Sequence, residues 1–194
     1  MKNLFAAVIL GIALAGAALA YTSTEEKSVE GTVVGRADEV KMAVVEFSPG
    51  AKVSGMTPEA KRQLQTALAA ALARSRKFDV ADVRWTRNES ANDLAAINAG
   101  SSTAAAVKLG KKLGVKYVLT GTIVEYTLKD ADDFGRVVLK TRLIEVATGK
   151  VRHADEITQR STGAMRTSGA VEMQAKAVKP AIDKLAAALL ELRL

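Results

Sequence analysis

The chain has 194 residues, of which 48% are hydrophobic and 25% charged, with a formal net charge of +7 and no cysteine. This length and composition are typical of one globular domain with a substantial core. The absence of cysteine excludes disulfides, thiol catalysis and thiolate metal sites. The positive charge favours anionic partners, although a charge of this size is also ordinary for a solvated surface.

The start of the chain has the pattern of a secretory signal peptide over residues 1–20. Lys2 supplies a positive charge, residues 4–14 form an uncharged apolar run, and Ala18-Leu19-Ala20 offers the small side chains that signal peptidase accepts. A retained membrane anchor is the alternative, but a span needs about 20 apolar residues and polar residues follow Ala20 at once. We therefore expect cleavage near Ala20 and a periplasmic or secreted protein.

Residues 21–40 show no sustained apolar period and predict a mobile arm, so the folded domain is expected to span residues 41–194. The continuous apolar run at residues 41–47 predicts a strand that is covered on both faces and ends at Ser48-Pro49-Gly50.

A helix is predicted next. Thr57 is a typical N-cap, Pro58 suits the first helical position, and a leucine every four residues gives the helix an apolar stripe that ends near Ser75. Residues 78–85 then predict a second strand.

The middle of the chain contains a polar segment, a helix and the longest strand. Residues 87–102 are polar, and residues 103–113 predict a helix that ends at Gly114 in a left-handed conformation. Residues 115–124 predict the most central strand. Gly121 within it predicts close approach of a helix or a neighbouring side chain.

A β-hairpin is predicted over residues 137–161, with its turn at residues 147–150. Centring the turn on its Thr-Gly pair places Arg142 opposite Asp155, a complementary pair that favours this register. The second strand, residues 151–161, is polar on both faces and is therefore predicted to be an edge strand.

Apolar residues recur at steps of four and three along residues 171–192, which predicts a C-terminal helix with one apolar seam. Pro180 interrupts the seam, so we expect a kink there or a helix that begins near it. The seam suits packing on a sheet, and a coiled coil is the alternative. The predicted fold class is α/β: a single domain with a mixed five-stranded sheet in the order β-α-β-α-β-β-β-α and helices packed on it.

Side chains suited to catalysis are few. His153 is the only histidine, which excludes a multi-histidine metal site, and a catalytic triad would have to use it beside Asp155 without a G-x-S-x-G motif. The Asp-rich residues 130–133 lack the closing glutamate of a calcium loop, and no phosphate-binding loop has the Walker spacing. We therefore predict a binding protein, not an enzyme, with no cofactor and no metal.

Candidate contact residues gather near the predicted edge strand, which could accept a strand from a partner protein. They are Arg142, Arg152, His153, Asp155 and Arg160. The polar residues 87–100 are a second candidate surface. Stacking aromatics are lacking and acids are interleaved, so nucleic acid is not expected as a partner. Outside the cytoplasm, anionic partners would be lipid headgroups, wall polymers or acidic protein surfaces, and peripheral membrane contact and oligomerisation stay open.

Three segments resemble the curli assembly/transport channel family: the strand at residues 41–47, the strand at residues 114–123 and the hairpin sequence at residues 142–151. The resemblance is greatest to the outer-membrane lipoproteins that activate a bifunctional penicillin-binding protein. In those lipoproteins a similar hairpin carries an Ala-Asp-Glu stretch, here Ala154-Asp155-Glu156. The resemblance covers about residues 41–192, and none of its motifs is catalytic.

Two departures narrow what this resemblance implies. The curli channel inserts two long hairpins into the membrane, and at the corresponding places this chain has only residues 128–136 and 162–170. One membrane strand needs about 9–11 residues, so neither segment is long enough for a hairpin of two strands. The lipid-bearing cysteine of the activators is also missing. The resemblance thus implies a soluble periplasmic adaptor that contacts proteins of envelope assembly, such as a peptidoglycan synthase or an outer-membrane assembly component. The alternatives are a structural subunit of an outer-membrane secretion or assembly complex, joined through the C-terminal seam, and an exported hydrolase that uses His153.

Overall fold

The computed structural model describes residues 39–53, 55–167 and 169–194 of the chain. The predicted signal peptide at residues 1–20, and all but the last two residues of the predicted arm at residues 21–40, lie outside this part. Among the helices of the described residues, none combines the length and the hydrophobicity needed to cross a bilayer.

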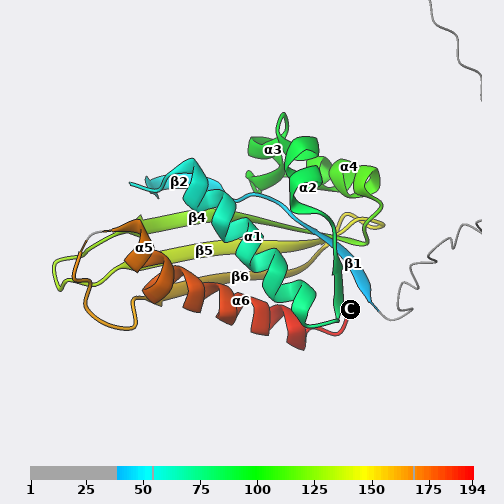
Figure 1. The fold of residues 1–194 in the computed structure, drawn as a ribbon. Helices are drawn as coiled ribbons and strands as arrows, with labels where there is room; N and C mark the ends of the chain where they lie inside the picture. Colours follow the sequence, from blue (N-terminus) through cyan, green and yellow to red (C-terminus); the bar gives the residue numbers. More distant parts are fainter. Residues whose placement is uncertain (1–38, 54, 168) are drawn as a thin grey trace, which may run out of the picture. The chain divides into compact units, whose positions relative to one another are not determined.

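Six strands form one mixed sheet (Figure 1). The strands are β1 (Val40–Val44), β2 (Ser48–Val53), β3 (Phe78–Val80), β4 (Tyr117–Thr127), β5 (Arg136–Glu145) and β6 (Val151–Arg160). Their order is β3-β1-β4-β5-β6, and β2 also pairs with β4. The pairs among β1 to β4 are parallel, whereas β4 with β5 and β5 with β6 are antiparallel. The predicted class, a mixed α/β single domain, is confirmed.

Helices cover the two faces of the sheet unequally (Figure 1). They are α1 (Pro58–Arg74), α2 (Val83–Ser90), α3 (Leu94–Asn98), α4 (Ala104–Leu113), α5 (Ala170–Met173), the π-helix η1 (Gln174–Val178) and α6 (Lys179–Glu191). On one face, α1, η1 and α6 enclose the larger core, in which Leu68 and Leu185 are fully buried. On the other face, α3 and α4 enclose a smaller core around Val118 and Ile144, and this layer extends over only part of the sheet.

The prediction that the first strand ends in a turn at Ser48-Pro49-Gly50 is wrong. These residues begin β2, in which Ser48 is paired with Thr122 of β4. Proline is tolerated here because β2 is an edge strand whose register shifts between Pro49 and Lys52. The sheet consequently has six strands instead of the predicted five.

The second predicted strand, residues 78–85, is also too long. Strand β3 ends at Val80, and α2 begins at Val83, because the Asp82 carboxylate accepts hydrogen bonds from the backbone N–H groups of Arg84 (2.9 Å) and Trp85 (2.8 Å). Such a side-chain cap favours a helix start over continued strand.

The hairpin and its edge strand are confirmed, but the predicted register is wrong by one residue. Arg142 lies opposite Ala154, and Asp155 lies opposite Thr141. The register shifts between Leu143 and Ile144, where β6 contains one additional residue, Arg152. This bulge was not visible in the charge pattern, which favoured pairing Arg142 with Asp155.

The C-terminal helix changes its winding before Pro180. Helix α6 begins at Lys179, as expected near a proline, and the π-helix η1 precedes it. The seam is buried from Val178 to Leu189, but Val171 is 85% exposed and Ala175 is exposed. A π-turn contains an additional residue, which rotates the preceding residues relative to the seam. The first two residues of the predicted seam therefore face away from the core.

The link between β6 and α5 is held by Glu172. Its carboxylate accepts hydrogen bonds from Nζ of Lys176 (2.6 Å) and from the backbone N–H groups of Thr167 (2.8 Å) and Arg166 (3.0 Å). These hydrogen bonds, that of Lys176 first, lower the pKa of Glu172 from 4.5 to about 2. The stabilisation is therefore fully present above pH 4.5 and is lost as the pH falls toward 2.

We expect Glu172→Gln to weaken the decline of the melting temperature between pH 4.5 and pH 2, measured by circular dichroism. The matched control is Glu191→Gln at the exposed end of α6, which should keep the slope of the parent protein. Identical slopes for both variants would contradict the role of the Glu172 carboxylate.

Candidate functional site

The five predicted contact residues do not converge on one point. In β6, exposure alternates: His153, Asp155, Ile157 and Gln159 are half-buried, while the residues between them are exposed. Ile157 packs on the larger core, so the half-buried set faces α6. The exposed set faces the opposite, less covered side of the sheet.

The side chain of Arg160 is engaged in contacts with other residues of the domain. Its guanidinium donates hydrogen bonds to the carboxylates of Asp130 (3.1 Å) and Asp132 (2.8 Å) and lies 4.1 Å from the ring centroid of Phe134. The Asp130 carboxylate also accepts from the backbone N–H of Phe134, and this bond and the Arg160 charge lower the pKa of Asp130. Arg160 thus ties the end of β6 to the β4–β5 loop.

Arg142 is likewise engaged within the fold. Its Nη1 donates to the carbonyl oxygen of Gly100 (3.0 Å), and its Nη2 donates to that of Ile97 (3.3 Å). A guanidinium near the carboxyl end of a helix satisfies carbonyl groups that lack helical partners. Arg142 therefore anchors α3 to the sheet, and of the three predicted arginines only Arg152 is left without a side-chain partner among the described residues.

His153 lies opposite Leu143, on the helix-covered side of the sheet. Its Nε2 is buried and makes no hydrogen bond within the described residues, whereas the Asp155 carboxylate accepts the backbone N–H of Glu156 (2.8 Å). No hydrogen bond in the described part of the chain joins His153 to a serine or an aspartate. The geometry gives no support to a hydrolase that uses His153.

The polar segment at residues 87–100 contains the end of α2 and all of α3, and its polar side chain Asn98 is buried. Nδ2 of Asn98 donates to the carbonyl oxygen of Glu46 (2.9 Å) and to Oγ of Ser48 (2.9 Å), and its Oδ1 accepts the backbone N–H of Gly121 (3.0 Å). Asn98 is 7% exposed, so these bonds fasten α3 to β4 and the β1–β2 junction. The polar side chain of Asn98 therefore has a structural role.

Two parts of the sheet are exposed to solvent: the region of this face that α3 and α4 do not cover, and the outer edge of β6. We call this surface the open sheet face and define it by four exposed side chains: Lys140, Arg152, Glu156 and Thr158. Lys140 is directly opposite Glu156. Within the described residues β6 pairs only with β5, so backbone N–H and C=O groups on its other side have no strand partner.

Of these four residues, only Arg152 was predicted as a contact residue. The alternation along β6 contains the missing signal: Ile157 is the apolar residue that points inward, so its neighbours Glu156 and Thr158 point outward. Of the other predicted residues, Arg142 and Arg160 are engaged by carbonyl and carboxylate groups of the fold. His153 and Asp155 are half-buried and face the helix-covered side of the sheet.

The fold defines the class of protein: a single mixed α/β domain with one helix-covered sheet face and one partly open face. A family model described as the peptidoglycan-synthase activator LpoB matches residues 60–159, which run from α1 to nearly the end of β6. The chain belongs to the peptidoglycan-synthase activator LpoB family. This match supports the predicted resemblance to synthase activators and does not support the curli assembly family. No curated protein sequence matches the chain.

Solved structures share the fold at low sequence identity. The lipoprotein GNA1162 from Neisseria meningitidis is 18% identical with a TM-score of 0.52, and the alignment covers 78% of this chain and 95% of that chain. The PelC dodecamer from Paraburkholderia phytofirmans is 20% identical with a TM-score of 0.50, covering 77% and 89%. The hypothetical protein CT253 from Chlamydia trachomatis is 12% identical with a TM-score of 0.53, covering 78% and 94%.

Proposed function

We propose that this chain is a non-catalytic periplasmic adaptor that binds a peptidoglycan synthase and regulates it through the open sheet face. The proposal rests on the family membership. The matched residues 60–159 contain all of β5 and nearly all of β6, which are the two strands that carry the open sheet face. The predicted signal peptide at residues 1–20 supports the periplasmic location.

The open sheet face suits contact with a protein in two ways. The free edge of β6 offers backbone hydrogen bonds to an added strand, and alternate side chains beside it supply specificity. Lys140 and Arg152 contribute positive charge that would complement an acidic partner surface and accelerate association.

The experiment combines binding and activity. We expect the purified protein to bind the bifunctional synthase of the same cell in surface plasmon resonance and to raise its rate of glycan polymerisation from a labelled lipid-linked precursor. The double variant Lys140→Glu with Arg152→Glu should bind about tenfold more weakly and lose the activation.

The control carries one charge reversal on the opposite side of the sheet, Lys184→Glu in α6, and should behave like the parent protein. Absence of binding by the parent protein would refute the function. Activation that survives in the double variant would refute the assignment to the open sheet face.

A second candidate function is that of a subunit in a multimeric envelope complex, because the structurally similar PelC is a dodecamer. The predicted interface for such a complex, the C-terminal seam, is wrong: Val178, Ile182, Leu185 and Leu189 are buried in the domain's own core. Multi-angle light scattering distinguishes the two functions. A monomer at micromolar concentration would contradict the hypothesis that the chain is a subunit of a multimeric complex.

A further inference from the structure

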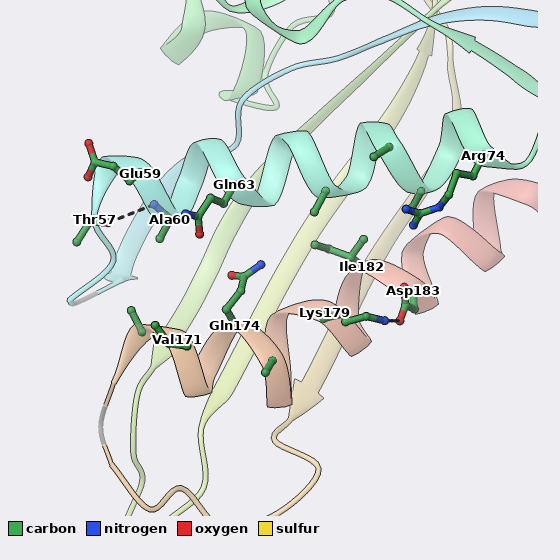
Figure 2. A pocket seen from close by; sticks show the side chains of 15 residues that line it. Thr57, Glu59, Ala60, Gln63, Arg74, Val171, Gln174, Lys179, Ile182 and Asp183 are labelled. Atoms are coloured by element: carbon green, nitrogen blue, oxygen red, sulfur yellow. Dashed lines mark hydrogen bonds and ion pairs between the residues drawn. The ribbon is translucent and has the colours of Figure 1, made fainter.

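A groove runs along the outside of the helical layer, between α1 and the α5–α6 segment (Figure 2). Its volume is about 660 Å³. Small apolar side chains dominate its walls: Ala67, Ala70 and Ala71 from α1, and Val171, Ala175 and Ile182 from the other side. The groove lies on the side of the sheet opposite the open sheet face, because α1 and α6 cover the larger core.

The π-helix is responsible for the apolar character of one wall. It turns Val171 and Ala175 away from the core and into the groove, where Val171 is 85% exposed. A valine so exposed beside several alanines leaves apolar surface in contact with water. Covering this surface is favourable, and π-turns frequently mark functional positions.

The shape of the groove suits a helix. Its lining extends from Thr57 to Arg74 and so follows the whole of α1, whose 17 residues span about 26 Å. Alanines along both walls allow the backbone of a third helix to approach closely, in the manner of ridges packed into grooves. Gln63 and Gln174 point toward each other across the groove (Figure 2). Sites for small ligands are usually enclosed pockets in which polar groups converge, whereas these two side chains lie at an open surface.

The charged residues around the groove favour a partner of one charge over the other. A second hollow of about 570 Å³ shares Ala67 and Ala70 with the groove and adds arginines from α1 and α2. The cations that line the two hollows are Arg62, Arg74, Arg84, Arg87 and Lys179, against the two carboxylates Glu59 and Asp183.

Several of these charges are already paired. Glu59 lies 4.0 Å from Arg62, and Asp183 lies 2.8 Å from Lys179. Arg87 lies 3.6 Å from the carboxylate of Glu46, which follows β1. Arg74 and Arg84 have no ion-pair partner within residues 39–53, 55–167 and 169–194. Arg74 therefore leaves uncompensated positive charge at the groove, and Arg84 leaves it in the adjoining second hollow.

We propose that this groove binds one amphipathic acidic helix of a partner protein. Apolar side chains of that helix cover Ala67, Ala70 and Val171, while its glutamates or aspartates face Arg74 and Arg84. The proposal does not depend on the partner of the open sheet face, since it concerns the other side of the sheet.

The test uses two fluorescein-labelled synthetic peptides of about 18 residues, whose length as a helix matches α1. Both carry leucines at the i, i+3, i+4 and i+7 spacing, and their polar positions hold glutamate in one and lysine in the other. Fluorescence anisotropy with the full chain should show at least about tenfold tighter binding of the glutamate peptide.

Two sets of variants locate the binding. Ala70→Arg should weaken binding of the glutamate peptide by about tenfold, whereas Ala96→Arg on the exposed surface of α3 should leave it unchanged. Arg74→Glu with Arg84→Glu should weaken the glutamate peptide and strengthen the lysine peptide. Melting curves establish that each variant is folded.

Equal affinity for the two peptides, or binding that ignores Ala70→Arg and the double charge reversal, would overturn the proposal. It would also be overturned by a dimer in light scattering that Ala70→Arg dissociates, because a second copy of the chain would then occupy the groove.

Discussion

Replacing Asn98 with alanine is expected to lower the free energy of unfolding by about 3 kcal/mol, because each buried polar group left without a partner costs about 1–3 kcal/mol. The substitution removes both donors and the acceptor of the side-chain amide. The backbone N–H of Gly121 and the carbonyl oxygen of Glu46 then lose the hydrogen bonds that Asn98 supplies.

Urea unfolding followed by circular dichroism measures this loss. The matched variant is Asn88→Ala, since Asn88 is exposed on α2 and makes no side-chain hydrogen bond in the described part of the chain. It should change the free energy of unfolding by less than about 0.5 kcal/mol. Equal stability of the two variants would show that the buried network around Asn98 does not fasten α3 to the sheet.

The second large effect is expected for Gly121→Ala. A Cβ at this position would lie 2.7 Å from ring atoms of Phe47, which confirms the close approach predicted from the glycine in the central strand. Phe47 is 1% exposed, so its ring cannot move without disturbing the core. Overpacking of this kind lowers the free energy of unfolding by about 1–3 kcal/mol.

Gly163→Ala provides the comparison, because nothing lies within 4 Å of the Cβ it would add. It should leave the stability unchanged or raise it by less than about 1 kcal/mol. Adding Phe47→Leu to Gly121→Ala should recover part of the loss, since the two side chains would otherwise overlap. Strict additivity of the two substitutions would argue against a direct contact between these positions.

The two surfaces described above give the domain distinct ways to meet partners. The open sheet face offers hydrogen-bonding groups and mixed charge, whereas the groove beside α1 offers apolar area flanked by arginines. They lie on opposite sides of one sheet. A protein with this arrangement could hold two partners at once, which accords with an adaptor in envelope assembly.

Local patterns in the sequence determined the elements whose causes are local. Oγ1 of Thr57 accepts the backbone N–H of Ala60 (3.2 Å) as an N-cap, and Gly114 has a φ of 67° at the end of α4, both as predicted. The hairpin and its polar edge strand were also predicted, because turn chemistry and alternation act over a few residues.

Tertiary structure decided everything that depends on contacts distant in the chain. The six-stranded sheet arises because β2 pairs with β4, about seventy positions later in the chain (Ser48 with Thr122). The β6 bulge at Arg152 and the π-helix before Lys179 each shift a period by one residue, which no local propensity indicates. Whether a charged side chain is engaged is likewise decided by contacts between distant parts of the chain. Arg142 and Arg160 resemble Arg152 in the sequence, but they bind carbonyl and carboxylate groups that the fold brings to them. Among the described residues, the Arg152 side chain has no such partner.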